Sequence, residues 1–299
     1  MKILSLITIG VGLLIAAPAN AELKVFACEP EWKALAEEIG GEKVEAYSAT
    51  HAMQDPHHIR AKPSLIAKMR NADLLICSGA SLEIGWLPIL LQKAGNAKMQ
   101  QGEVGYLMAS EYVDILEKPE TIDRSMGDVH PEGNPHIHLN PHNILKVANE
   151  LTDRLISIDE ENRDYYIIQK SSFDYKWELA IRRWEKKAAN LKGENVITHH
   201  KNWVYLSDWL GLNLIETLEE KSGVPPSSSH LEKVLQTARN NEILAILRTP
   251  YSPSDASEWL AEKTQIPALV LPFTVGGNEQ ANDLFSLFDE TIRMLKEQK

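Results

Sequence analysis

The chain has 299 residues, of which 43% are hydrophobic and 24% are charged, and its formal net charge is −11. This composition is typical of a globular protein and excludes a disordered, collagen-like or coiled-coil chain. The acidic balance argues against nucleic acid as a partner, because proteins that bind it usually carry a basic face. Two cysteines are too few for a disulfide-rich scaffold.

Residues 1–21 have the features of a secretory signal peptide. Lys2 supplies the positive charge, residues 3–17 are apolar and uncharged, and Ala19-Asn20-Ala21 matches a cleavage site. The apolar run is shorter than the roughly 20 residues of a membrane-spanning helix. We therefore expect export to the periplasm. Glu22, not a cysteine, follows the cleavage site, so no lipid anchor is expected.

The first part of the mature chain alternates between strands and helices. Strands are expected over 23–27, 44–47 and 74–77, and helices over 32–39 and 63–71. This alternation predicts a parallel sheet covered by helices. Cys28 and Cys77 lie near the ends of the first and third strands, so a disulfide forms if those strands are adjacent. Two buried thiols, or thiols near a metal, are the alternatives.

A single long helix is predicted over 162–191. These 30 residues contain no glycine or proline, and apolar residues recur at helical spacing from Tyr166 to Ala188. At 1.5 Å per residue the helix would be about 45 Å long, more than the diameter of a small domain. We expect it to link two lobes and to end before Gly193.

The alternation then resumes. Strands are expected over 195–198, 212–216, 243–247 and 268–271, and helices over 203–210, 230–240, 254–264 and 282–296. The predicted fold is therefore α/β, with two Rossmann-like lobes of parallel sheet and helices joined by one long rigid helix. The N-terminal lobe would span 22–160, the linking helix 161–191 and the C-terminal lobe 192–299.

Nine of the ten histidines fall into three clusters, each after a predicted strand or in the loop that follows it. The clusters are His51, His57 and His58; His130, His136, His138 and His142; and His199 and His200. Ligands bind at the carboxyl ends of strands in open α/β sheets, and imidazole is a common metal ligand. The clusters therefore predict a metal site in one cleft. We assign structural roles to His51, His142 and His230.

A long loop precedes the second cluster. Residues 118–135 contain three prolines, two glycines and many polar side chains, and long loops in compact domains are often functional. Asp128, His130 and Glu132 in this loop could gather metal. A solvated loop without such a role is the alternative.

Three motifs, in order along the chain, carry a family resemblance. They are Asp55-Pro56-His57 with Pro63-Ser64 after it, the run Asn134-Pro-His-Ile-His-Leu-Asn-Pro141, and His200-Lys-Asn-Trp-Val-Tyr205 followed by Gly211-Leu212. Over essentially the whole mature chain, the sequence resembles the substrate-binding proteins of zinc and manganese ABC transporters, the ZnuA-like cluster.

The resemblance implies metal ligands at His57, His136 and His200, with the ion between two lobes. It also implies a monomer that is not an enzyme and that meets an ABC transporter permease in the inner membrane. His58 is an alternative to His57, although the register set by Pro63-Ser64 favours His57. His138 could be a substitute ligand or support one. His199 should point elsewhere, because side chains alternate along a strand.

One departure from the family bears on the metal. Many members have an acidic fourth ligand in the turn after the last strand, but here residues 271–277 contain no carboxylate and Glu279 comes later. The predicted ligand set is therefore three histidines, completed by water or by a side chain not yet identified. Imidazole suits Zn²⁺ and carboxylate oxygen suits Mn²⁺, so zinc is the predicted cargo, with manganese less favoured and copper and nickel open.

Two other functions are possible for such a site. Three histidines and a water also form catalytic zinc sites, so a secreted zinc metallohydrolase is one alternative. However, Asn140 stands where the H-x-H-x-D-H pattern of such enzymes requires an aspartate, and no general base is evident. A periplasmic metallochaperone for zinc or copper is the other alternative.

Overall fold

The structure is a computed structural model that describes residues 22–121, 127 and 130–299. The predicted signal peptide lies outside these residues. Within the described ranges, no helix combines the length and the apolar character needed to cross a membrane.

The N-terminal half forms a parallel four-stranded sheet in the order β2-β1-β3-β4. The strands are β1 (Leu23–Ala27), β2 (Val44–Ser48), β3 (Leu74–Cys77) and β4 (Tyr106–Met108), and the helices are α1 (Pro30–Gly40), α2 (Pro63–Arg70) and α3 (Leu87–Ala94). The sequence did not predict β4 or α3. They have three and eight residues, respectively.

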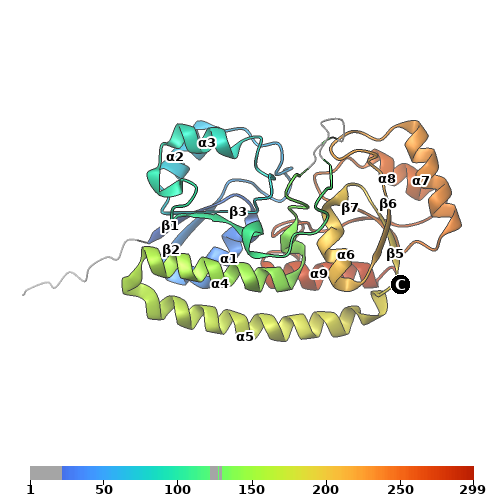
Figure 1. Ribbon diagram of the computed structural model, residues 1–299. Helices are drawn as coiled ribbons and strands as arrows, with labels where there is room; N and C mark the ends of the chain where they lie inside the picture. The colour runs from blue at the N-terminus through green and yellow to red at the C-terminus, as the bar shows by residue number, and fades with distance from the viewer. Residues whose placement is uncertain (1–21, 122–126, 128–129) are drawn as a thin grey trace, which may run out of the picture.

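The C-terminal half repeats this arrangement with the order β6-β5-β7-β8, again all parallel. Its strands are β5 (Asn195–Thr198), β6 (Asn213–Thr217), β7 (Ala245–Arg248) and β8 (Ala268–Val270), and its helices are α6 (Val204–Leu210), α7 (Ser228–Asn240), α8 (Asp255–Thr264) and α9 (Leu284–Lys296). The predicted α/β class with two lobes is confirmed, and Figure 1 shows the lobes beside each other.

The helix α5 (Arg163–Ala188) runs beneath both lobes, and α4 (Pro141–Ile158) lies between it and the first lobe (Figure 1). The long helix predicted from the sequence is α5, whose 26 residues span about 39 Å. It packs against α1 of the first lobe and α9 of the second. Its partner α4 was not predicted, although it buries one clear apolar face. The lobe boundaries proposed at residues 160 and 192 remain predictions.

The two lobes share one apolar core. A single cluster of buried side chains includes Val25 of the first sheet, Val196 of the second, and Trp177 and Trp184 of α5. Two smaller clusters lie separately within the individual lobes. Because a packed core deforms little, the shared cluster resists a wide opening of one lobe against the other.

A disulfide joins Cys28 and Cys77, as the sequence predicted for adjacent strands. β1 pairs directly with β3, and this pairing brings the two Cα atoms to 4.8 Å, within the range of ordinary disulfides. Both cysteines are fully buried.

Aromatic packing around α5 should contribute most to the stability of the apolar core that the two lobes share. Trp177 is fully buried, stacks on Phe173, meets Phe288 of α9 edge-on and donates its indole N–H to the Pro141 carbonyl. We expect Trp177→Ala to lower the free energy of unfolding by about 3–5 kcal/mol, because it leaves a large cavity. Chemical denaturation of the metal-free protein measures this change.

The matched control is Tyr175→Ala on the same helix, since Tyr175 is 68% exposed. Its effect should stay within about 0.5 kcal/mol. Equal losses in the two variants would show that α5 contributes through helix formation and not through the shared core.

Candidate metal centre

His57 is held by the turn that follows β2. The Asp55 carboxylate accepts hydrogen bonds from the His57 backbone N–H at 3.0 Å and from the ring Nδ1 at 2.7 Å. Trp86 donates its indole N–H to the Pro56 carbonyl at 2.9 Å, which fastens the turn to the buried core. With Nδ1–H directed at the carboxylate, Nε2 of His57 carries the free lone pair.

His136 is placed by a related turn. The Asn134 side-chain oxygen accepts from the His136 backbone N–H at 3.1 Å, just before the short 3₁₀ turn Ile137–Leu139 and α4. Asn134 also donates to the Lys201 carbonyl at 2.8 Å, which ties this loop to the one that carries His200. The ring of His136 is almost fully buried and meets the ring of Phe273 edge-on.

His200 follows β5 and precedes the 3₁₀ turn Lys201–Trp203. Its Nδ1 lies 2.7 Å from the carboxylate of Glu219, in the segment after β6. Glu219 also accepts the Gly223 backbone N–H at 2.9 Å. The carboxylate orients the ring as Asp55 orients His57, so Nε2 of His200 is the free nitrogen.

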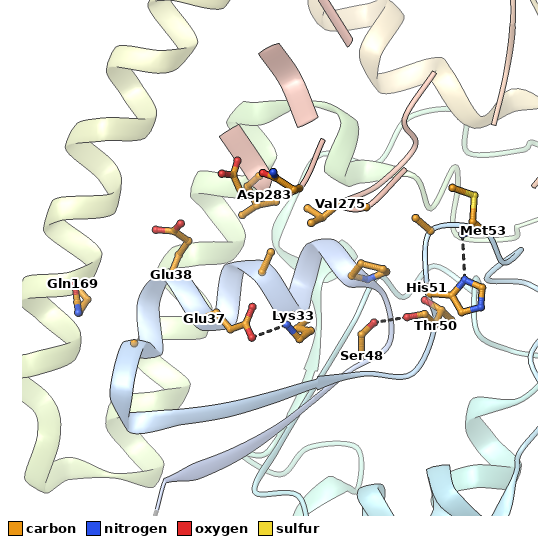
Figure 2. Close-up of a pocket in the computed structure, with 17 residues that line it drawn as sticks. Lys33, Glu37, Glu38, Ser48, Thr50, His51, Met53, Gln169, Val275 and Asp283 are labelled. Carbon is orange, nitrogen blue, oxygen red and sulfur yellow. Dashed lines mark hydrogen bonds and ion pairs between the residues drawn. The ribbon is translucent and has the colours of Figure 1, made fainter. Parts of the chain in front are cut away.

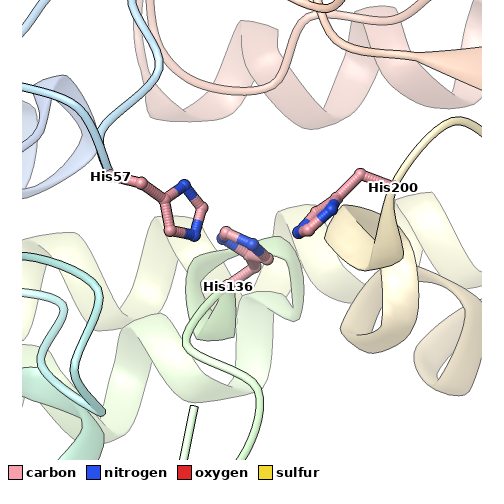
Figure 3. Close-up of side chains that lie close together, drawn as sticks. All are labelled: His57, His136 and His200. Atoms are coloured by element: carbon pink, nitrogen blue, oxygen red, sulfur yellow. The ribbon is translucent and has the colours of Figure 1, made fainter. Parts of the chain in front are cut away.

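The structure brings the three predicted ligands together. His57, His136 and His200 each offer a nitrogen, and these three atoms lie within 4.8 Å of one another. Figure 3 shows the three rings converging from separate segments of the chain. Among the residues that the structure describes, no carboxylate joins this group of three histidines. In place of an acid, the turn 271–277 presents Phe273 to His136.

The alternative ligands lie outside this group. His58 is exposed. His138 is buried, with Nε2 2.9 Å from the Phe273 carbonyl and Nδ1 3.1 Å from Glu31. His199 is buried with Nε2 3.4 Å from Glu219, so it supports the carboxylate that holds His200.

The three histidines to which the sequence analysis assigned structural roles each have a hydrogen-bond or ion-pair partner outside the group of converging rings. His51 accepts the Met53 backbone N–H, and exposed His142 pairs with Glu185. His230 lies in the first turn of α7, where its backbone N–H is capped by Ser227 and its ring bonds to the Thr217 carbonyl.

The surroundings favour a neutral ring at His136 and an ionised carboxylate at Glu219. Burial, and then the neighbouring rings of His57 and His200, hold the pKa of His136 well below its usual value. Burial alone would raise the pKa of Glu219, but hydrogen bonds from His199 and His200 outweigh it and lower this pKa to about 2. Neutral imidazoles backed by anions are prepared to bind a cation.

A fourth ring lies in the cluster, and the sequence analysis did not count it as a ligand. His130 Nε2 is 3.2 Å from His57 Nε2, and its ring centroid lies 6.4 Å from that of His136. Burial, followed by the rings of His57 and His200, lowers the pKa of His130 to about 4. The sequence signal for this ligand candidate was the position of His130 in a long loop just before His136.

The hollow beside the histidines is small. It has a volume of about 70 Å³ and is lined by Asp55, His57, His199, His200, Asn202, Glu219, Gly223, Tyr251, Ser252 and Pro253. A larger pocket of about 670 Å³ lies beside α1, and Figure 2 shows that it is lined by His51 but by none of the three converging rings. Pockets for small organic ligands usually measure about 300–1,000 Å³, so the hollow at the histidines suits an ion.

Relatives of this chain are substrate-binding proteins of ABC transporters. A manganese ABC transporter substrate-binding lipoprotein, PsaA of Streptococcus anginosus, is 23% identical over 86% of this chain and 82% of its own length. The high-affinity zinc uptake protein ZnuA of Bacillus subtilis is 23% identical over 77% of this chain and 71% of its own. A crystal structure of ZnuA superposes with a TM-score of 0.76 at 20% identity, covering 93% of this chain and all of that one.

The family model of the periplasmic zinc-uptake complex component A matches residues 25–298, nearly the whole described chain. The relatives, the fold and the convergent histidines agree with this match. The chain therefore belongs to the ZnuA family, the metal-binding substrate-binding proteins of ABC transporters.

Proposed function

We propose that this protein binds Zn²⁺ between its two lobes through His57, His136 and His200 and delivers it to the permease of an inner-membrane ABC importer. It would do so as a monomer in the periplasm. The observation that carries the proposal is the convergence of three imidazoles from three separate segments.

The surroundings of these rings support a metal. Two of the three have a carboxylate on Nδ1, the arrangement that usually orients histidine ligands. Nδ1 of His136 is buried and has no hydrogen-bond partner among the described residues, which is a costly state for a polar atom. Asn202 lies 3.4 Å from the other nitrogen of this ring.

The donor chemistry favours zinc over manganese. The relatives are named for both metals, so kinship does not separate them. All the grouped donors are imidazole nitrogens, which suit zinc, whereas manganese prefers carboxylate and other oxygen ligands.

The small hollow supports cargo binding over hydrolysis. A hydrolase needs space for an organic substrate next to its metal-bound water, and about 70 Å³ is well below the usual size of such pockets. Kinship to transporter components points the same way.

Each proposed ligand can be removed separately. We expect His57→Ala, His136→Ala and His200→Ala to weaken zinc binding by more than about 10-fold each, since even loss of a partner behind a ligand often costs that much. Competition titration against a chromophoric zinc chelator measures the dissociation constants.

His142→Ala is the matched control for the ligand variants. His142 also follows an Asn-Pro pair whose asparagine accepts its backbone N–H, but its side chain is 50% exposed on the surface. Its affinity should equal that of the unaltered chain. Unchanged affinity in all three ligand variants would disprove this site, and preference for Mn²⁺ over Zn²⁺ would disprove the cargo.

The role of Glu219 behind His200 can be tested in the same assay. Glu219→Gln should weaken zinc binding roughly 10- to 100-fold, because the neutral amide holds the ring less firmly and contributes no negative charge. Glu220→Gln, at the exposed neighbouring position, should leave the affinity unchanged. Equal effects would point to net charge instead of ring orientation.

The depressed pKa of His136 predicts a pH effect on the metal-free protein. An unfolded histidine has a pKa near 6.5, so below this pH the unfolded chain takes up a proton that folded His136 refuses. This group therefore lowers the free energy of unfolding as pH falls from about 6.5 toward the folded pKa. In the presence of chelator, His136→Gln should show a shallower loss of stability over that range.

A stability profile of His136→Gln that runs parallel to that of the unaltered chain over this pH range would contradict the depressed pKa.

A further inference from the structure

The strongest unexplained feature of the site is the position of His130. The ring is half-buried, its centroid lies 5.2 Å from that of His57, and its Nε2 lies 3.2 Å from His57 Nε2. No carboxylate belongs to the group of three converging histidines found in the described part of the chain. His130 is therefore a candidate for the position that an acid or a water would otherwise fill.

The contact involves the one nitrogen of His57 that is free to bind a metal. Nδ1 of His57 bonds to Asp55, which leaves Nε2 as the donor atom. His130 directs its own Nε2 at that same atom. When a metal occupies His57 Nε2, the hydrogen bond between the two rings cannot persist, so His130 must either coordinate the same ion or move away.

The spacing of the two nitrogens fits coordination. With Zn–N bonds of 2.0–2.1 Å, two ligands of a tetrahedral zinc have nitrogens about 3.3 Å apart. The two Nε2 atoms stand 3.2 Å apart, close to one edge of such a tetrahedron. Little movement of His130 toward an ion would be needed.

Described residues near His130 contact both lobes. Ser81 of the first lobe donates to Glu132 at 2.7 Å, and Gly127 forms a bridge with Ser222 of the second lobe. The Gly133 N–H donates to the His130 carbonyl, and the φ of Gly133 is 115°, a value that disfavours any other residue. These contacts hold residues 130–133 beside the rings of His57 and His136.

We propose that His130 is a fourth ligand of the bound metal, giving a site of four neutral imidazoles. The inference rests on the proposed function, because it assumes that His57, His136 and His200 hold the ion. Asp55 and Glu219, bonded to two of the rings, supply the balancing negative charge from behind. A shell of four nitrogen donors would further favour zinc over manganese.

X-ray absorption at the zinc edge of the zinc-loaded protein counts the imidazoles directly and needs no substitution. The unaltered chain should show the outer-shell scattering of four imidazole rings, and His130→Ala that of three rings plus an oxygen donor such as water. His130→Ala should also raise the zinc dissociation constant by about 10-fold or more, whereas His142→Ala should leave both readouts unchanged.

The outcomes separate the two proposals. Three imidazoles in the unaltered chain would overturn the assignment of His130 and leave the proposed function intact. This holds even if His130→Ala weakens binding, because a ring that only supports the loop changes the affinity without changing the number of ligands. If zinc does not bind, or if His57→Ala binds as tightly as the unaltered chain, the proposed function itself fails.

Discussion

The site depends on the apolar core that the two lobes share beneath it. Val25 and Val196, from different sheets, belong to the same buried cluster as Trp177 and Trp184 of α5. This packing sets the distance between the edge that carries His57 and the edge that carries His200. Convergence of nitrogens from separate segments within 4.8 Å requires such a fixed distance, because an error of a few ångströms would abolish any common coordination.

Above that core, the charge pattern is layered. Burial keeps the pKa of His136 low, and the anions stand one step behind the other two converging rings, with Asp55 on His57 and Glu219 on His200. Glu31 of the first lobe is a further buried acid. It accepts a hydrogen bond from Thr274 in the turn 271–277 of the second lobe and lies 3.1 Å from His138. A bound ion would contact imidazole nitrogens directly. The carboxylates behind the rings would balance its charge without coordinating it, an arrangement that suits zinc better than manganese.

The chain uses one local turn three times. In Asp55-Pro56-His57, Asn134-Pro135-His136 and Asn140-Pro141-His142, the first side chain accepts the backbone N–H of the histidine. Proline fixes the middle of the turn, so the histidine leaves it in a defined direction. The first two turns face the seam between the lobes, whereas the third starts α4 and leaves His142 on the surface. The motif itself therefore does not identify a ligand, and its place in the fold does.

Much of the fold was accessible from local pattern. The strand and helix alternation, the long helix without glycine or proline, and the helix that begins at the Ser227 cap all depend on neighbours in sequence, and each is present in the structure. The elements β4 and α3 were missed, whereas β8 and α2, with the same lengths of three and eight residues, were predicted, so length alone does not decide whether a pattern is readable. The amphipathic helix α4 was also missed, although its Asn140 cap and Pro141 are readable start signals.

The sequence by itself determined the α/β class and, through the family resemblance, offered three histidines as ligands; the disulfide between Cys28 and Cys77 depended on strand adjacency that the structure supplied. Only the tertiary structure decided which rings meet. It placed His138 between the Phe273 carbonyl and Glu31, turned His199 toward Glu219 and brought His130 against His57. Such contacts join residues up to 135 positions apart, and their geometry follows from how two sheets pack on one core, which no local pattern records.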